Sequence, residues 1–196
     1  RYFGFHGGAT NFFNGEGTGG GFSYRLDDVA LEPSDLPEDF YSTHAFTDYG
    51  IQFIEERDKA KPFFMYMAYN APHYPLHAPE AEVMKYTGKY MDGWQNVRDT
   101  RFARLKELGI IEADVTFSNK EKVIGGWNGL SESQKIDMDL RMATYAAMID
   151  IVDQQVGRLV ETLKQEGIYE DTLIVFLSDN GACPFDRTRK PTKENN

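Results

Sequence analysis

The sequence predicts an α/β fold in which a mostly parallel sheet is flanked by helices. Two short apolar runs, residues 61–69 and 171–181, have the composition of strands that are buried on both faces. A stretch with helical spacing precedes each run, and strands joined by helical crossovers form parallel sheets. The chain has 196 residues, of which 41% are hydrophobic, so it can build one substantial core without requiring a second. We therefore expect one globular domain or a piece of a larger one.

The first 40 residues (1–40) are expected to form a loop region that is rich in glycine and aromatic side chains. Gly15, Gly17 and Gly20 fit the pattern G-x-G-x-x-G, which binds dinucleotides where it follows a strand and opens a helix. Neither context is present, so this pattern does not predict a nucleotide site.

Two helices are predicted in the first part of the core, which we place at residues 41–182. One begins at Ser42 or Thr43, either of which can cap it, and continues to about Arg57. The other covers about residues 97–108 and ends at a glycine.

A longer helix is predicted before the second apolar run. Ser131 and Gln134 form a capping box, and apolar side chains then follow helical spacing as far as Gly167. Such a length favours a kink or a split near Gly157. Residues 183–196 are expected to be an exposed loop or tail, because the last ten of them, RTRKPTKENN, include no large apolar side chain.

The composition argues against several classes of partner. Acidic residues outnumber basic ones 31 to 21, which gives a net charge of −10, and the basic residues are scattered along the chain. A nucleic-acid partner is therefore not expected. No segment approaches the roughly 18 consecutive apolar residues of a membrane span. The single cysteine cannot form an internal disulfide.

Polar residues follow both predicted strands, and the carboxyl ends of parallel strands meet at one edge of a sheet. Asp179 and Asn180 offer a carboxylate and an amide oxygen, which suit Ca²⁺ or Mg²⁺ better than Zn²⁺. The alternative interpretation of Asp-Asn-Gly is an ordinary turn. Its place at the end of a buried strand makes the two interpretations equally strong.

His73 and His77 follow the first predicted strand. Their spacing would suit a zinc pair on a helix, but Pro75 lies between them and excludes a helix. A histidine on a loop bounded by prolines can instead donate a hydrogen bond to an anion. The alternative is a surface or packing histidine.

Cys183 is the only cysteine and raises the question of a nucleophilic thiolate. A reactive thiolate needs a positive neighbour or a helix N-terminus, and the sequence places only Arg187 nearby. A buried or incidental cysteine is the favoured interpretation.

Three segments together resemble the sulfatase family, a branch of the alkaline-phosphatase-like superfamily. They are RYFGFHGGATNFF at residues 1–13, KPFFMYMAYNAPHYPLHAP at 61–79, and the helix and strand end at 145–181. The resemblance spans nearly the whole chain in the family's order. It implies an incomplete alkaline-phosphatase-like fold, with residues 1–196 forming the central part of a single catalytic domain.

In this family the nucleophile is a formylglycine made from the Cys or Ser of a C/S-x-P-x-R motif that precedes the metal-binding pair. Cys183 begins CPFDR, in which the proline comes one position too early, and it follows that pair. No serine begins the motif either, so the formylglycine is expected upstream of this chain. The isolated chain is therefore expected to be inactive.

The resemblance also implies roles for individual residues. Asp179 and Asn180 match two ligands of the catalytic Ca²⁺ or Mg²⁺, and His73 matches the histidine that contacts the sulfate group. We expect His6 and His77 to line the rim of the substrate pocket.

The implied activity is hydrolysis of a sulfate monoester of a small molecule or glycan, by attack of the hydrated formylglycine on sulfur and release of the alcohol and then of sulfate. A periplasmic or secreted location is also implied. Two alternatives stay open: a phosphodiesterase or phosphonate hydrolase of the same superfamily, and a non-catalytic module that retains the fold.

Overall fold

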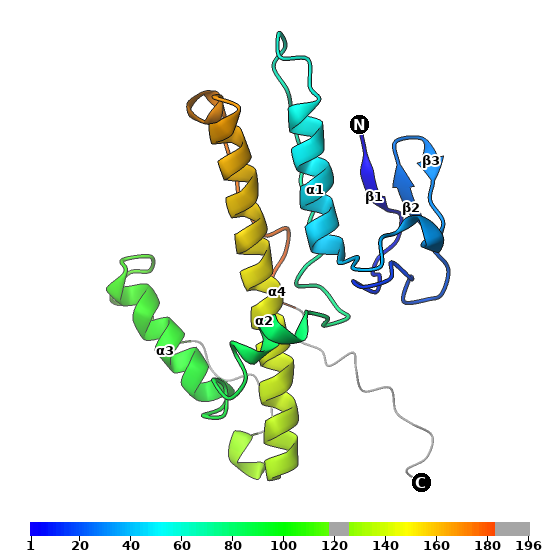
Figure 1. Ribbon diagram of the computed structural model, residues 1–196. Coiled ribbons are helices and arrows are strands. Elements are labelled where there is room, and N and C mark those ends of the chain that lie inside the picture. Colours follow the sequence, from blue (N-terminus) through cyan, green and yellow to red (C-terminus); the bar gives the residue numbers. More distant parts are fainter. Residues whose placement is uncertain (118–125, 183–196) are drawn as a thin grey trace.

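The computed structural model describes residues 1–117 and 126–182, and two long helices form its centre (Figure 1). Helix α1 (Ser42–Glu55) lies beside α4 (Glu132–Gln165), and Arg158 of α4 donates to Asp48 of α1 at 2.7 Å. The short α2 (Glu80–Met84) packs against α4, whereas α3 (Trp94–Glu107) stands apart from the helix pair and buries no residue. Three single-turn 3₁₀ helices complete the helical elements: η1 (Pro33–Asp35), η2 (Trp127–Gly129) and η3 (Tyr169–Asp171).

A three-stranded antiparallel sheet occupies the N-terminal region, beside α1 (Figure 1). Its strands are β1 (Phe3–Phe5), β2 (Tyr24–Leu26) and β3 (Val29–Ala30), in that order, with Phe3 opposite Leu26. The loop region expected over residues 1–40 thus also contains this small sheet. Two of the aromatic side chains that suggested a packed loop, Phe3 and Phe5, belong to β1, and the Phe3 ring stacks on Tyr49 of α1 at 3.8 Å.

The predicted helices are present, with corrections at their ends. The N-cap position of α1 is Tyr41, which makes no capping side-chain hydrogen bond, and the hydroxyls of Ser42 and Thr43 are buried in the first turn. The backbone N–H of Ser42 donates to the Phe12 carbonyl at 2.8 Å, and this contact packs the first turn against the N-terminal loop. Helix α3 begins at Trp94, three residues before the predicted start.

Helix α4 confirms the capping box and removes the predicted break. Gln134 N–H donates to Ser131 Oγ at 3.3 Å, and Ser131 N–H donates to Gln134 Oε1 at 2.8 Å. The helix then continues for 34 residues through Gly157. Its buried face packs along α1 and α2, so tertiary contacts support the helix on both sides of this glycine. None of the helices in the described part of the chain combines the length and hydropathy needed to cross a bilayer.

Two buried clusters fix the position of the loop that follows the first apolar run. One cluster contains Phe12, Tyr41, Met148 and Ile151, with Ala71, Leu76 and Ala78 of that loop packed against it. The other contains Val83, Ala143 and Ala147. The core therefore joins the N-terminal loop, α1, α4 and the loop at residues 70–79, which we call the Pro-rich loop.

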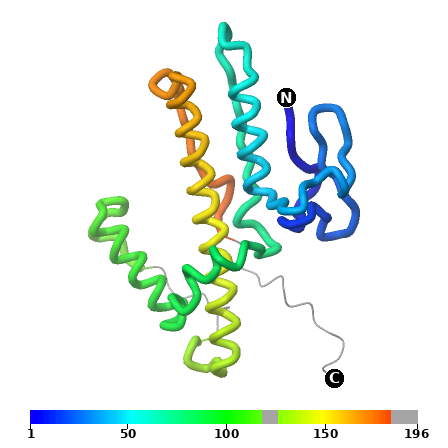
Figure 2. The backbone as a smooth tube through the Cα atoms, in the orientation of Figure 1, coloured from blue at the N-terminus to red at the C-terminus, as the bar shows by residue number. Residues whose placement is uncertain are grey.

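The two predicted strands are extended but unpaired. Figure 2 shows each running back along the helix that precedes it. In residues 61–69 one side packs on α1, where Tyr69 Oη lies 2.7 Å from Thr47 Oγ1, whereas Phe64 is 93% exposed. In residues 171–181, Leu173 is 89% exposed.

The expected parallel sheet is therefore not confirmed: in residues 1–117 and 126–182 the only strand pairs are antiparallel. A strand needs a hydrogen-bonding neighbour along its edge, and the described residues place none beside either run. Apolar composition alone indicated the strands, but it does not specify their partners.

Candidate functional site

The Pro-rich loop holds His73 in a defined orientation. Its backbone N–H donates to the Asn70 carbonyl at 2.8 Å, and its Nδ1 lies 2.6 Å from the Tyr74 carbonyl oxygen. A carbonyl oxygen only accepts, so Nδ1 carries a proton and Nε2 is the nitrogen left for a ligand. The Ala71–Pro72 and Tyr74–Pro75 peptide bonds, on either side of His73, are both cis.

His77 is packed against the N-terminal loop. Its ring lies 5.8 Å from the Phe13 ring, and its carbonyl accepts a hydrogen bond from Tyr41 Oη at 2.9 Å. Nδ1 of His77 is buried without a hydrogen bond among the described residues. Burial lowers the pKa of His77 below its usual value, and the neutral ring is therefore favoured.

A small cavity separates the N-terminal loop from the Pro-rich loop. Its volume is about 240 Å³. Tyr74 is part of the cavity wall, and its carbonyl oxygen accepts a hydrogen bond from His73 Nδ1. The cavity therefore lies next to His73 along the chain. The residues that line it come from both loops: Asn11, Glu16, Gly17, Thr18, Tyr74, Pro75 and His77.

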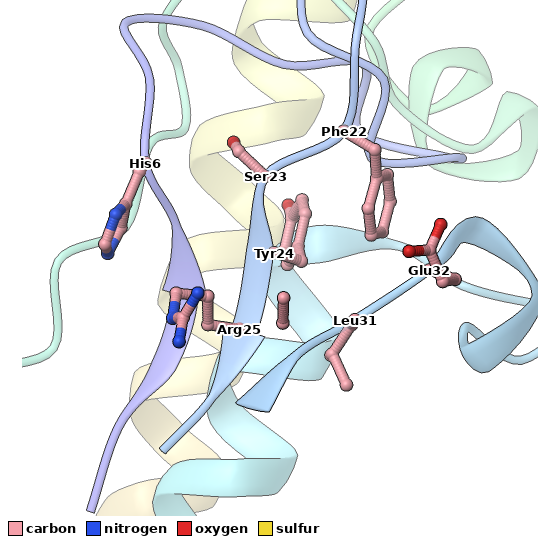
Figure 3. Close-up of a pocket in the computed structure, with 8 residues that line it drawn as sticks. His6, Phe22, Ser23, Tyr24, Arg25, Leu31 and Glu32 are labelled. Carbon is pink, nitrogen blue, oxygen red and sulfur yellow. The ribbon is translucent and has the colours of Figure 1, made fainter. Parts of the chain in front are cut away.

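His6 lies at a different cavity, of about 230 Å³, which is lined mainly by β2 and by the residues at and after the end of β3. Figure 3 shows His6 on the opposite side of β2 from Phe22 and Glu32. Its ring meets the Tyr2 ring edge-on at 5.8 Å. The structure thus brings His73 and His77 together on one loop and does not bring His6 to the same cavity.

Asp179 and Asn180 lie at the exposed end of the second apolar run. Ser178 Oγ donates to the Asn180 carbonyl at 2.7 Å, and Asn180 Nδ2 donates to the Gly181 carbonyl at 2.8 Å. Because the amide of Asn180 uses its nitrogen locally, its Oδ1 is left available beside the carboxylate of Asp179. Two hard oxygen donors at adjacent positions fit a Ca²⁺ or Mg²⁺ ion.

These two residues make only part of a metal site. The described residues hold no group of three or more His, Cys, Asp or Glu side chains that could bind an ion. Within the same residues, no hydrogen bond or ring contact joins Asp179 or Asn180 to His73. Cys183 lies outside the described residues.

Sequence patterns missed several polar groups near His73. Glu16 and Thr18 line the cavity, and the Oδ1 of Asn70 is buried without a hydrogen bond in the described part of the chain. No spacing rule could find Glu16 or Thr18, because only the packing of two distant loops brings them beside the Pro-rich loop. The signal for Asn70 was its place at the end of an apolar run.

Comparison with known proteins identifies the family. The sulfatase family model matches residues 3–195, and the chain belongs to the sulfatase family. The α/β, alkaline-phosphatase-like fold class expected from the sequence follows from this membership.

Two proteins similar to this chain are also named as sulfatases. An arylsulfatase from Klebsiella aerogenes is 41% identical over 186 residues, which cover 93% of this chain and 39% of that protein. An uncharacterized sulfatase from Schizosaccharomyces pombe is 34% identical over 164 residues, covering 80% of this chain and 30% of that protein.

A multifunctional alkaline phosphatase superfamily protein, PehA of Trinickia caryophylli, is 27% identical over 152 residues, covering 76% of this chain and 29% of that protein. The chain thus spans about two fifths or less of the length of these three relatives.

Proposed function

We propose that the full-length protein containing this chain hydrolyses sulfate monoesters. The observation that carries the proposal is a sulfatase family match over residues 3–195 that includes both the Pro-rich loop and the Asp179-Asn180 pair. The first has a histidine nitrogen available for an anion, and the second has two oxygens suited to a divalent cation. A site that binds and cleaves a sulfate ester needs both kinds of group.

His73 is proposed to act at the sulfate group. With Nδ1 committed to the Tyr74 carbonyl, only Nε2 can reach a substrate. Protonated Nε2 would donate a hydrogen bond to a sulfate oxygen, or would give its proton to the alcohol oxygen as the sulfur–oxygen bond of the ester breaks. The short local hydrogen bond fixes the ring before the substrate arrives, so little ordering is needed on binding.

Asp179 and Asn180 are proposed to hold Ca²⁺ or Mg²⁺. When bound, the ion would polarise the sulfate oxygens and lower the pKa of the nucleophile. The proposed nucleophile is a formylglycine supplied by polypeptide outside these 196 residues, because no C/S-x-P-x-R motif occurs within them. The isolated chain would therefore be inactive.

We further propose that residues 1–196 form the central part of one catalytic domain, in which the two apolar runs join a mostly parallel sheet. Sheet neighbours would cover side chains such as Phe64 and Leu173, which are 93% and 89% exposed in the structure. A periplasmic or secreted location, expected from the resemblance, completes the proposal.

A phosphodiesterase or phosphonate hydrolase is the second candidate. The similarity to PehA, whose name describes a multifunctional member of the alkaline phosphatase superfamily, favours it. A non-catalytic module is the third possibility, and activity of any kind would exclude it.

The test is hydrolysis of 4-nitrophenyl sulfate and bis(4-nitrophenyl) phosphate by the full-length protein with Ca²⁺ present. The proposal predicts a higher kcat/KM for the sulfate. Preference for the phosphodiester would replace it with the second candidate. A non-catalytic module would be favoured if the protein hydrolysed neither of these substrates nor a 4-nitrophenyl ester of methylphosphonate.

A further inference from the structure

The dipeptide Asn-Gly occurs three times in the chain, and one copy lies at the candidate metal site. The copies are Asn14-Gly15, Asn128-Gly129 and Asn180-Gly181. This dipeptide is chemically labile, because the backbone nitrogen of the glycine can attack the side-chain carbonyl carbon of the asparagine and close a cyclic imide. Glycine favours the attack, since it has no β-carbon to crowd the approach and its backbone turns freely. All copies carry the same reactive groups, so their surroundings decide which of them reacts.

Two copies have the attacking nitrogen held in a hydrogen bond. The Gly15 N–H donates to the Asn11 carbonyl at 2.9 Å, and Gly15 is buried. The Gly129 N–H donates to the Gly126 carbonyl at 3.0 Å, at the end of η2. Ring closure must first break these bonds, so the structure protects both copies.

The third copy lacks this protection. Asn180 and Gly181 are exposed, and the Gly181 N–H donates no hydrogen bond within the described residues. The side-chain amide of Asn180 lies beside Gly181, because its Nδ2 donates to the Gly181 carbonyl at 2.8 Å. Nothing lies within 4 Å of the place that a β-carbon on Gly181 would occupy. The attacking nitrogen is therefore accessible to water and hydroxide, and the group it attacks is next to it.

We propose that Asn180 is a site of spontaneous deamidation, and that a divalent ion bound at this residue suppresses the reaction. Hydroxide removes the proton of the Gly181 N–H, and the nitrogen forms a bond to Cγ of Asn180. The bond between Cγ and Nδ2 breaks, and the amide nitrogen takes a proton from water and leaves as ammonia. Water then opens the imide at either of its carbonyl carbons, which gives an aspartate or an isoaspartate at this position. Nothing is oxidised or reduced.

The reaction removes the amide of a proposed metal ligand. In the isoaspartate product the backbone runs through the former side-chain carbon, so the carboxylate no longer occupies the position of Oδ1 beside Asp179. An ion bound to Oδ1 holds the Asn180 side chain in one orientation and keeps Cγ from turning toward the Gly181 nitrogen. Protein that is kept without its ion therefore loses the capacity to bind the ion again. The protective role rests on the metal site proposed above, whereas the deamidation itself does not.

The experiment incubates the full-length protein in mildly alkaline buffer, with EDTA or with Ca²⁺ at about 100 times its dissociation constant. Peptide mass spectrometry follows the conversion of amide to carboxylate at all three copies, and calorimetric titration measures the fraction of protein that still binds Ca²⁺. The test variant is Gly181→Ala, whose β-carbon fits the open space but crowds the attack. The matched control is Gly129→Ala, which adds a β-carbon at a second open Asn-Gly position.

In EDTA, Asn180 is expected to deamidate at least about fivefold faster than Asn14 and Asn128, the factor that one ordinary hydrogen bond adds to a barrier. Gly181→Ala should slow the reaction at Asn180 by at least as much, and Gly129→Ala should leave it unchanged. Ca²⁺ should slow it about 100-fold, because only about 1% of the molecules are then without an ion. The fraction that binds Ca²⁺ should fall with deamidation in the wild type and stay constant in Gly181→Ala.

An amide that persists at Asn180 in EDTA would overturn the deamidation site while the proposed sulfatase activity stands. Equal rates at the three copies would also overturn it, because they would show that unfolding exposes every copy alike. Deamidation of Asn180 that is as fast or faster with Ca²⁺ would overturn the protective role of the ion. Fresh wild-type protein that binds no Ca²⁺ would overturn the proposed metal site and the protective role together.

Discussion

The Pro-rich loop and the strand end at residues 171–182 each carry half of the candidate site, yet they are supported very differently. The Pro-rich loop packs on the cluster that contains Phe12 and Met148, a hydrogen bond orients the His73 ring, and the His77 ring packs against Phe13. The strand end is exposed from Leu173 onward, and the side-chain hydrogen bonds of Ser178 and Asn180 stay within residues 178–181. The contacts that hold the first half are thus present in the described residues, whereas those that would hold the second are absent from them.

This difference indicates which half of the candidate site can adopt its functional geometry in the isolated chain. Buried apolar contacts and defined hydrogen bonds hold a side chain in one rotamer, and such preorganisation is what binding and catalysis require. An exposed apolar run gains little by staying in place. We therefore expect the histidine half to be formed in the chain alone, and the metal half to depend on sheet neighbours.

The largest expected effect is loss of all turnover in the isolated 196-residue chain. The full-length protein should hydrolyse 4-nitrophenyl sulfate, whereas the chain should not, because its nucleophile and part of its metal site are missing. Steady-state assays at equal concentration test this difference. Hydrolysis by the chain alone that is abolished by Asp179→Ala would show that the metal half is complete within it.

Substitutions of His73 should separate the two ring nitrogens in the full-length enzyme. His73→Asn can keep the hydrogen bond to the Tyr74 carbonyl but has no group at the position of Nε2, and kcat should fall about 10²- to 10⁴-fold. His73→Gln places an amide nearer to that position and should retain more activity. The assigned role of Nε2 would be contradicted if the asparagine variant were the more active one.

Two truncations compare the packing of the halves directly. Phe12→Ala removes a side chain with 0% exposure and should lower the free energy of unfolding by about 3–5 kcal/mol. Leu173→Ala removes one that is 89% exposed and should change the stability of the chain by less than about 0.5 kcal/mol. Denaturant titration measures both values.

The Leu173 variant also tests the proposed sheet. In the full-length protein the same truncation should cost about 2–5 kcal/mol if neighbouring strands bury this side chain. A cost that stays near zero in the full-length protein would contradict the sheet.

The smallest expected effect is the pH dependence that His77 confers on stability. Burial lowers the pKa of His77 in the folded state, so the unfolded state binds its proton more readily. The contribution is complete above the ordinary value of about 6.5 and is lost as the pH falls toward the folded pKa. The melting temperature should fall between pH 7 and pH 5, and less steeply in His77→Asn. If the melting temperature changed equally with pH in the wild type and in His77→Asn, His77 would not contribute to the pH dependence of stability.

The sequence could predict the parts of the structure that local patterns determine. The Ser131–Gln134 capping box and the long helix after it depend on spacing within a few turns, and both are confirmed. The family resemblance is confirmed by the match over residues 3–195. The positions of the metal and sulfate residues stay predictions, because no contact within the described residues joins them.

Other features could not be predicted because they depend on distant contacts. Ser42 lies inside the first turn of α1, not at its N-cap, and its N–H bonds to the N-terminal loop. The β1–β2–β3 sheet was hidden in a glycine-rich segment that resembles a loop in composition. The cavity beside His77 arises where two loops some 60 residues apart meet, and no local spacing records that meeting.

The central claim is that Asp179 and Asn180 bind the divalent ion of the full-length enzyme. Calorimetric titration of Ca²⁺ into the wild type, Asp179→Ala and the control Asp171→Ala tests it most directly. Asp171 is an exposed acid at the other end of the same segment. We predict that Asp179→Ala weakens Ca²⁺ binding by more than the roughly 10- to 100-fold lost when an outer partner of a metal ligand is removed, and that Asp171→Ala binds like the wild type. Equal affinity of all three proteins for Ca²⁺ would contradict the claim.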